Sequence, residues 1–476
     1  MLKVAPGPSL LTRIAYGIGG GAIGIKNSGF EFFLLLYYSQ VLGVSAHLVS
    51  VALFLALAID AISDPVVGYW SDNIRSRLGR RHPFMYAAIL PVGIAYFFAW
   101  NPPAGLSGNE LFPWLVFITI SVRLFYTLYE VPSLALAAEL SQDYDIRTTL
   151  MSYRYFCAWV CGLGIQVLLM VYLLRPTDTV TMGFFNLDGW HTYGLWASAL
   201  LIITITICTA GTHRYIPNFK APPPPRKLTI RKVLSEVLET ISNRSFRALF
   251  LAFLFGLLAS GISASLNQYI NGYFWEFTTD QIAGLTVGVF VSTVLALVLA
   301  PQVSKTIGKK RGVIIIGLVA FTLMPAPVFA RLLGFMPPNG TETLFYLVLI
   351  ITTFDLTLII TAQILMAAMV ADIVEESELT TGRRSEGIFY AGIRKLSQGA
   401  GILMAGIILS VADLHPGMQP GTVPESSLDI LGWGYAVSLL VVWMLMISSI
   451  RFYEISRENH EANLEALAVQ DAIKPA

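Results

Sequence analysis

The sequence has few charged residues, few cysteines and few histidines. Only 13% of its 476 residues are Asp, Glu, Lys or Arg, against about 25% in an ordinary soluble domain. The three cysteines, Cys157, Cys161 and Cys208, lie in apolar stretches, so we predict no disulfide. The six histidines lie near loops or tails without metal-ligand spacing. We therefore predict that the chain is not an enzyme and has no cofactor, and a net charge of +1 gives no reason to expect a nucleic-acid partner.

Apolar residues are abundant and spread along the whole chain. They make up 55% of it, and the mean hydropathy is +0.66. A membrane-spanning helix needs about 20 predominantly apolar residues. We predict an all-α polytopic membrane protein with twelve transmembrane helices, near residues 14–41, 47–71, 83–101, 113–140, 149–174, 193–211, 247–274, 282–303, 312–334, 343–371, 386–411 and 429–452. The first is too long for a cleaved signal peptide and is predicted to be retained.

Lysines and arginines are concentrated in every second loop between these predicted spans. Most of the 31 lysines and arginines lie in segments on one side of the predicted membrane, and only Arg175 and Arg331 lie near the other. Because basic loops stay in the cytoplasm, both termini are predicted to be cytoplasmic, in a multi-pass protein of the plasma membrane or, in a bacterium, the inner membrane.

The chain divides at a polar, proline-rich stretch that includes the run Pro222–Pro225 and reads as a cytoplasmic linker. We predict an N-terminal six-helix half (1–211), the linker (212–246), a C-terminal six-helix half (247–453) and a cytoplasmic tail (454–476). A weak repeat supports two pseudo-symmetric halves, because the loops 68–83 and 301–313 both place a glycine before clustered bases.

Two aspartates, Asp60 and Asp64, stand one helical turn apart in the second predicted span. An ionised aspartate near the bilayer centre costs roughly 2.5–3.5 kcal/mol on insertion scales, so two on one face need a compensating partner. Oxygen ligands buried together favour a hard cation such as sodium, and the same acids can instead carry a proton. Arg123 and Asp355, also inside spans, are interpreted as structural partners.

Three stretches resemble the glycoside–pentoside–hexuronide cation symporter family of the major facilitator superfamily. They read DAISDPVVGYWSDNIRSRLGRRHP from Asp60, YTLYEVPSLALAAEL from Tyr126 and DIVEESELTTGRRSEGIFYAGIRKLSQGAG from Asp372. The resemblance implies the major facilitator fold. It also implies cation-coupled symport of a sugar, glycoside or related organic solute by alternating access.

The resemblance also implies residue roles for the cation. Asp60, Asp64 and Thr127 match the family's cation ligands, and Ser63 stands where the family's melibiose permease has an asparagine. Lys395 matches the lysine of the eleventh helix that neighbours the carboxylates and couples the two halves. Asp60 and Asp64 are thus expected ligands of sodium, and a proton remains the alternative coupling ion.

The solute site matches the family less well. Glu130 stands at the position of a sugar-binding aspartate and Arg154 at that of an arginine, but Gly24 and Leu134 replace an acid and a tryptophan. Galactoside specificity is therefore in doubt. The candidates that substitute are Lys26, Asn27 and Tyr153, and Asn267 and Asn271 either line the cavity or bond neighbouring helices.

Basic residues at the cytoplasmic side are predicted to hold a gate through ion pairs between the halves: Arg75, Arg77, Gly79, Arg80, Arg81, Arg383 and Arg384. A sodium-dependent lysolipid transporter of the same fold remains an alternative, since such transporters resemble this chain in the same aspartates and lysine. The expected partners are a small-molecule solute, a monovalent cation and the lipid bilayer, and the protein is expected to be monomeric.

Overall fold

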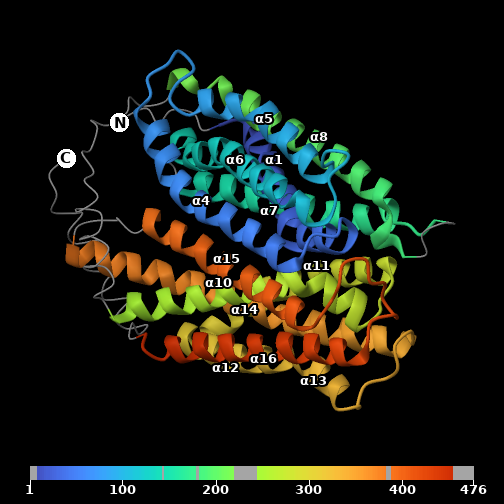
Figure 1. Cartoon of the computed structure of the whole chain (residues 1–476). Helices are drawn as coiled ribbons and strands as arrows, with labels where there is room; N and C mark the ends of the chain where they lie inside the picture. The colour runs from blue at the N-terminus through green and yellow to red at the C-terminus, as the bar shows by residue number, and fades with distance from the viewer. Residues whose placement is uncertain (1–7, 142–143, 178–181, 219–243, 382–386, 454–476) are drawn as a thin grey trace. The chain divides into compact units, whose positions relative to one another are not determined.

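The structure is a computed structural model that describes residues 8–141, 144–177, 182–218, 244–381 and 387–453 (Figure 1). All regular secondary structure in these ranges is helical. In chain order the helices are α1 (Leu10–Ile18), α2 (Gly20–Asn27), η1 (Ser28–Phe33), α3 (Leu34–Leu36), η2 (Tyr37–Val41), α4 (Ala46–Asn73), α5 (His82–Trp100), η3 (Gly108–Leu111), α6 (Phe112–Leu140), α7 (Tyr144–Leu168), η4 (Leu169–Leu173), η5 (Gly183–Phe185), α8 (Leu187–His213), η6 (Ile216–Asn218), α10 (Arg244–Tyr269), η7 (Ile270–Phe274), α11 (Thr279–Thr306), α12 (Lys309–Leu323), α13 (Ala326–Leu332), α14 (Glu342–Thr381), α15 (Gly387–Val411) and α16 (Glu425–Ile450).

The predicted all-α membrane architecture is confirmed. Within the described residues, 10 helical segments are long and apolar enough to cross a membrane. The two other predicted spans are also helical: α15 covers the eleventh, and the series from α1 to η2 covers the first. The first span is subdivided, whereas the sequence predicted one continuous segment.

The first span contains a π-helical turn, η1, after which the Leu34 amide donates to the Gly29 carbonyl five residues back. η2, η4 and η7 are π-helical turns, in which an amide bonds a carbonyl five residues back: Leu42 N to Tyr37 O, Leu174 N to Leu169 O and Trp275 N to Ile270 O. Such turns are short insertions in α-helices and often occur at functional sites. They end the first, fifth and seventh predicted spans.

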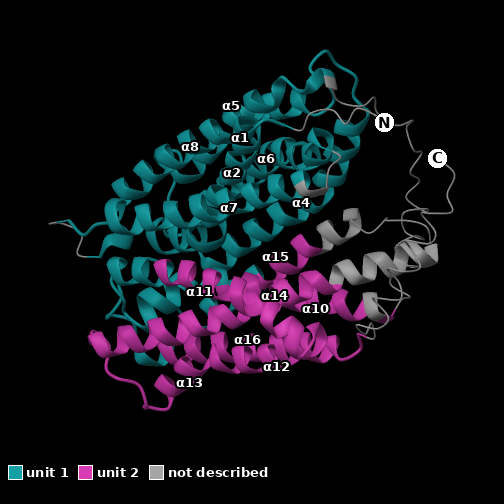
Figure 2. Ribbon diagram, turned by 180° about the vertical axis from the view of Figure 1, so that it is seen from behind, with its two compact units in different colours: residues 1–226, 264–286, 402–427 teal, residues 227–263, 287–401, 428–476 magenta. Residues whose placement is uncertain are grey.

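The described chain forms two compact units (Figure 2). The first comprises residues 1–226, 264–286 and 402–427, and the second comprises 227–263, 287–401 and 428–476. The first unit therefore holds the N-terminal six spans together with adjoining ends of α10, α11 and α15. Most of the predicted linker and the whole predicted tail lie outside the described residues.

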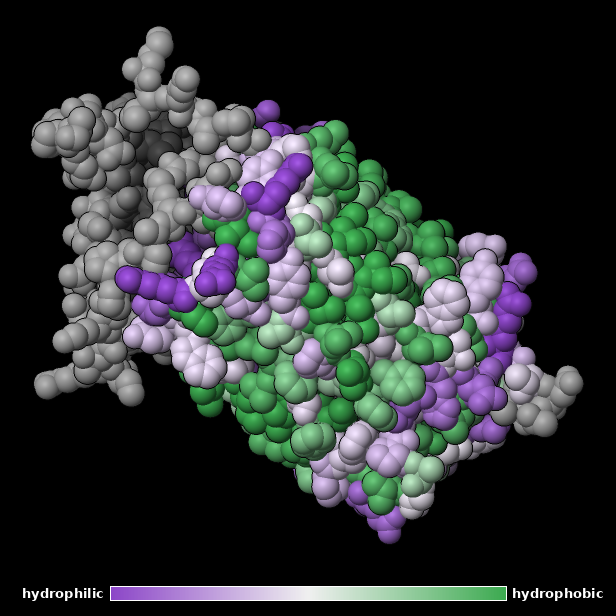
Figure 3. All heavy atoms as spheres, turned by 90° about the horizontal axis from the view of Figure 1, so that it is seen from above, coloured by the Kyte–Doolittle hydropathy of each residue, from purple (hydrophilic) through white to green (hydrophobic). Residues whose placement is uncertain are grey.

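Large apolar side chains are exposed along the predicted spans. Examples are Leu90 (60% exposed), Phe117 (62%), Val294 (62%) and Ile350 (66%). Figure 3 shows hydrophobic side chains over much of one face, with hydrophilic ones gathered toward its edges. Exposed apolar surface on this scale is what a helix presents to lipid, so the chain is a multi-pass membrane protein.

Glycines let helices approach closely at related places in the two sequence halves. A Cβ on Gly24 of α2 would lie 2.8 Å from the backbone nitrogen of Gly162 on α7. A Cβ on Gly401 of α15 would lie 3.0 Å from the Cα of Gly261 on α10. The first and fifth spans of each half thus cross at small residues, which is how membrane helices gain packing contacts. This agreement supports the internal repeat.

These crossings predict a position-dependent cost of adding a methyl group. We expect Gly24→Ala to lower the stability of the folded protein by about 1–3 kcal/mol, because backbone atoms of α7 cannot move aside as a flexible side chain would. The matched control is Gly164→Ala on α7, where nothing lies within 4 Å of the added Cβ. Thermal unfolding in detergent should show a lower melting temperature than wild type for Gly24→Ala and an unchanged one for Gly164→Ala. Equal melting temperatures for the two variants would refute the close approach.

Candidate cation and solute site

Two carboxylates and a hydroxyl meet where α4 packs along α6. Thr127 Oγ1 lies 2.9 Å from Asp60 Oδ1 and 3.0 Å from Asp64 Oδ1. Asp60 is 3% exposed, Thr127 is fully buried and Asp64 is half-buried. The spacing of one turn on α4 brings both acids to the face that meets α6. The structure therefore brings together three of the four predicted cation ligands.

One threonine hydroxyl lies within hydrogen-bond distance of a carboxylate oxygen from each of the two aspartates. A threonine hydroxyl has one hydrogen, so it can donate to only one of the two carboxylates at a time. The other contact is between two oxygen atoms within hydrogen-bond distance. A proton on one carboxyl group, or a cation that both oxygens coordinate, would make this second contact favourable.

Arg123 is a member of this site that the sequence interpretation missed. Its Nη1 lies 2.9 Å from Asp60 Oδ2, and the pair is buried, with side-chain exposures of 7% and 3%. Arg123 is therefore the ion-pair partner of Asp60. The available signal was its position four residues before Thr127, which places both on one face of α6.

Lys26 lies beside the same cluster. It is 5% exposed on α2, and its Nζ is 4.4 Å from the centre of the Tyr126 ring. Tyr126 is 1% exposed and precedes Thr127 on α6. A buried ammonium over an aromatic face is a favourable cation–π contact. The predicted substitute for the missing first-helix acid thus faces the carboxylate site from α2.

An acidic side chain does not fit at the position of Gly24. A side chain there would meet the backbone of α7, as the Cβ position shows. The acid that the family carries at this point therefore has no room here. Leu134, at the position of the family's tryptophan, is 48% exposed.

Arg154 is buried with unused hydrogen-bonding capacity. It is 2% exposed on α7, its Nη2 donates to Ser133 Oγ of α6 at 2.9 Å, and its Cζ lies 5.4 Å from the centre of the Tyr16 ring of α1. Its Nε and Nη1 have no hydrogen-bond partner among the described residues. Unsatisfied donors on a buried guanidinium are costly. They point to a ligand that accepts hydrogen bonds.

The other predicted residues have more modest roles in this structure. The hydroxyl of Ser63 donates to the backbone carbonyl of Asp60 at 3.3 Å, so it stays within reach of the site. Glu130 is half-buried on α6, about one helical turn after Tyr126. Asn27 and Tyr153 are also half-buried, and the backbone of Tyr153 packs against Gly17.

Two further groups of predicted residues lie on other helices. Asn271 Nδ2 donates to Asn267 Oδ1 at 3.2 Å, one turn back. The two side chains are therefore hydrogen-bonded to each other within one face of the seventh span, and their role in lining the cavity or bonding neighbouring helices stays a prediction. Lys395 is half-buried on α15 in the second unit. Its proximity to the carboxylates stays a prediction.

The arginines after α4 hold their own half together. Arg80 Nη2 and Arg81 Nε lie 2.8 and 2.9 Å from Glu139 Oε1 at the end of α6. Arg81 also pairs with Asp72 and donates to Ser71 Oγ. Gly79 takes a φ of 73°, which shapes the turn, and Arg75 and Arg77 are exposed. Arg383 and Arg384 lie outside the described residues, so the predicted pairs between halves stay a prediction.

Buried tyrosines join the far ends of the first and seventh spans. Tyr269 and Ser39 share a short hydrogen bond. The Tyr273 hydroxyl donates to the carbonyl of Met418 at 3.0 Å and lies 3.3 Å from Gln40 Oε1. All these residues belong to the first unit. The end predicted to be extracellular is thus closed by contacts between η2, η7 and the loop after α15.

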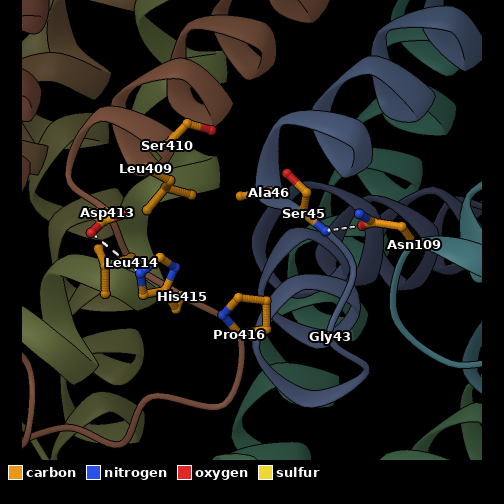
Figure 4. A pocket seen from close by; sticks show the side chains of 10 residues that line it. All are labelled: Gly43, Ser45, Ala46, Asn109, Leu409, Ser410, Asp413, Leu414, His415 and Pro416. Carbon is orange, nitrogen blue, oxygen red and sulfur yellow. Dashed lines mark hydrogen bonds and ion pairs between the residues drawn. The ribbon is translucent and has the colours of Figure 1, made fainter.

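A cleft of about 310 Å³ lies at this same end (Figure 4). Ser45 and Asn109 line one side, where the Ser45 amide donates to Asn109 Oδ1 at 2.9 Å. Asp413 and His415 line the other side, where His415 Nε2 lies 3.3 Å from Asp413 Oδ2. Ala46 of α4 also lines the cleft, and Asp60 is fourteen residues further along that helix, about 21 Å away. The cleft is therefore separate from the carboxylate site.

The comparison with protein families decides the assignment. Residues 15–457 match the family model described as MFS/sugar transport protein. The chain belongs to this family. The resemblance to the glycoside–pentoside–hexuronide symporters and the predicted major facilitator fold are thereby confirmed.

Relatives in the MFS/sugar transport family match along nearly the whole chain. Inner membrane symporter YicJ of Escherichia coli (strain K12) is 24% identical and covers 97% of this chain and 95% of its own. The isoprimeverose transporter of Lactiplantibacillus pentosus is 22% identical, with 94% and 88% covered. Sphingosine-1-phosphate transporter MFSD2B of Xenopus tropicalis is 24% identical, with 97% and 91% covered. Among solved structures, a D-xylose-proton symporter shares the fold, with a TM-score of 0.60 at 16% identity over 92% of this chain and 96% of that one.

Proposed function

We propose that this protein is a secondary active transporter that carries a sugar or related organic solute into the cell together with sodium or a proton. The observation that carries the proposal is the shared hydroxyl of Thr127 between Asp60 and Asp64. A proton or a cation between the carboxyl groups fits this arrangement. Symporters among the relatives support the same activity.

The cation and solute sites are adjacent on one helix. Thr127, which touches both carboxylates, and Ser133, which holds Arg154, lie six residues apart on α6. Binding of a cation between α4 and α6 fixes α6, and a solute held by Arg154 gains from that order. Such coupling is reciprocal, so each ligand raises the affinity for the other.

The tyrosine contacts between η2 and η7 favour one stage of the cycle. These contacts at the end predicted to be extracellular support a conformation in which the outer gate is shut. Alternating access requires these contacts to break when the outer side opens. This orientation, with both termini in the cytoplasm of a plasma-membrane protein, is part of the proposal.

An amphipathic phosphate-bearing solute is a second candidate. The unused donors of Arg154 suit a phosphate as well as sugar hydroxyls. One relative is a sphingosine-1-phosphate transporter. The exposed Leu134, in place of an aromatic platform, also suits an acyl chain.

Uptake into proteoliposomes tests both candidates. Purified protein is reconstituted, and isoprimeverose, D-glucuronate and sphingosine-1-phosphate are offered with an inward sodium gradient, an inward proton gradient, or neither. We expect accumulation of a sugar-type solute only with one of the gradients. Accumulation of sphingosine-1-phosphate alone would replace the sugar by the second candidate, and uptake independent of both gradients would refute symport.

A further inference from the structure

Asp355 is a buried acid that the site described above does not use. It belongs to α14 in the second unit and is the fourteenth of the 28 residues of the span Glu342–Met369. This position places it near the middle of the bilayer. Its side chain is only 2% exposed. An acid in the membrane interior needs a physical account.

Within the part of the chain that the structure describes, no basic residue forms an ion pair with this carboxyl group. Among the described residues, Asp355 Oδ1 also has no hydrogen-bond partner. An isolated ionised carboxylate is strongly disfavoured in an apolar interior, and such a group loses its charge by binding a proton. The neutral carboxylic acid is the form that this position accommodates.

The described residues of α10, α11, α12 and α16 place no charged side chain at this depth. The Tyr435 hydroxyl of α16 is the titratable group near Asp355, and it also lies near Ser263 of α10. Ser292 of α11 donates to the Thr353 carbonyl at 2.8 Å. The described charged residues of these helices and of α12 lie at their ends: Arg244, Arg247, Asp280, Lys305, Lys309, Lys310, Arg311, Glu425 and Asp429.

We propose that Asp355 carries a proton in this conformation and is a proton-binding site in the C-terminal half, separate from the Asp60–Asp64 site. The proton comes from water and is released to water when a conformational change exposes the carboxyl group. The buried state then holds one proton more than the exposed state. Acidic conditions favour the buried state, and the ratio of the two states changes by up to tenfold per pH unit.

The proposal goes beyond the proposed symport, because it adds an ion-binding group that the resemblance does not assign. Its first test does not depend on transport. Infrared spectra of the full chain in lipid nanodiscs at neutral pH are compared between wild type and D355N, in which the amide imitates the neutral acid in shape. The matched control is D429N, which removes an exposed aspartate of the same unit.

We expect the wild-type minus D355N difference to contain the carbonyl band of a protonated carboxyl group, and this band should shift in heavy water. The D429N difference should contain carboxylate bands only. D355E provides a second variant in which a protonated band persists at a changed position. A carboxylate signal in place of the protonated band in the D355N difference overturns the proposal.

A second test measures the consequence for transport and rests on the proposed function. Uptake of isoprimeverose into proteoliposomes is measured from pH 6 to pH 9 for wild type, D355N, D429N and D60N. We expect D355N to lose a pH-dependent change of up to tenfold per pH unit that wild type and D429N retain. Identical pH profiles for wild type and D355N overturn a role in the cycle. Loss of gradient-driven accumulation in D60N, with the infrared band retained, separates this proposal from the symport itself.

Discussion

Asp60→Asn is expected to abolish cation-driven accumulation of the solute. An inward membrane potential of 100 mV contributes about 2.3 kcal/mol per cation moved, which supports roughly 50-fold accumulation. Without one carboxylate the shared site no longer holds a cation, so the variant should only equilibrate its solute across the membrane. Uptake of isoprimeverose into proteoliposomes, with and without a gradient, measures the difference.

Asp60→Asn also leaves Arg123 buried without its partner, and breaking a buried pair costs about 3–5 kcal/mol. Two further variants separate lost coupling from lost folding. The double variant D60N/R123Q removes both charges and should recover the melting temperature without recovering accumulation. Thr127→Val keeps the shape and both charges, and it should also lose cation dependence. Wild-type accumulation in T127V would show that the shared hydroxyl plays no part.

Arg154→Lys is expected to weaken solute binding by about 10- to 100-fold while the melting temperature changes little. Lysine keeps the charge, but it lacks the fork of donors that leaves Nε and Nη1 of Arg154 available for a ligand. Each hydrogen bond to a charged group contributes about 1.5–3 kcal/mol. Equilibrium binding of isoprimeverose or D-glucuronate to purified protein gives the affinity.

The matched control is Arg175→Lys. Arg175 is exposed, and its Nε donates to the backbone of Val171, so its replacement should leave solute affinity unchanged. Cation affinity in the absence of solute should be unchanged in both variants, because Arg154 does not touch the carboxylates. An Arg154→Lys affinity within twofold of wild type would remove this residue from the solute site.

The sequence predicted the carboxylate site because its signal is local. Two acids one turn apart in an apolar segment share a helix face whatever the rest of the fold does. The role of Arg123 was harder to predict. Its sequence position places it on the same helix face as Thr127, but its ion pair with Asp60 depends on how α4 and α6 approach each other. Partner choice between helices is a property of packing, which no single segment encodes.

The backbone features were predictable only in part. Helix content and span positions follow from runs of apolar residues, so ten spans appear where they were expected. The π-helical turns at η2 and η7 have no comparable periodic signal. The close helix crossing at Gly24 could not be predicted either, because a glycine in an apolar run occurs equally in helices that make no close contact. The tyrosine contacts of the closed end depend on residues more than 200 positions apart.

The most direct test of the cation site is a sodium titration of the purified, sodium-free protein in weakly buffered solution, with bound sodium and released protons both recorded. We predict that wild type binds sodium with release of a proton or, if the proton is the coupling ion, takes up one proton in a parallel acid titration without sodium. Asp64→Asn should lose the response. A wild type that exchanges neither ion, or a variant indistinguishable from it, would contradict a cation site between α4 and α6.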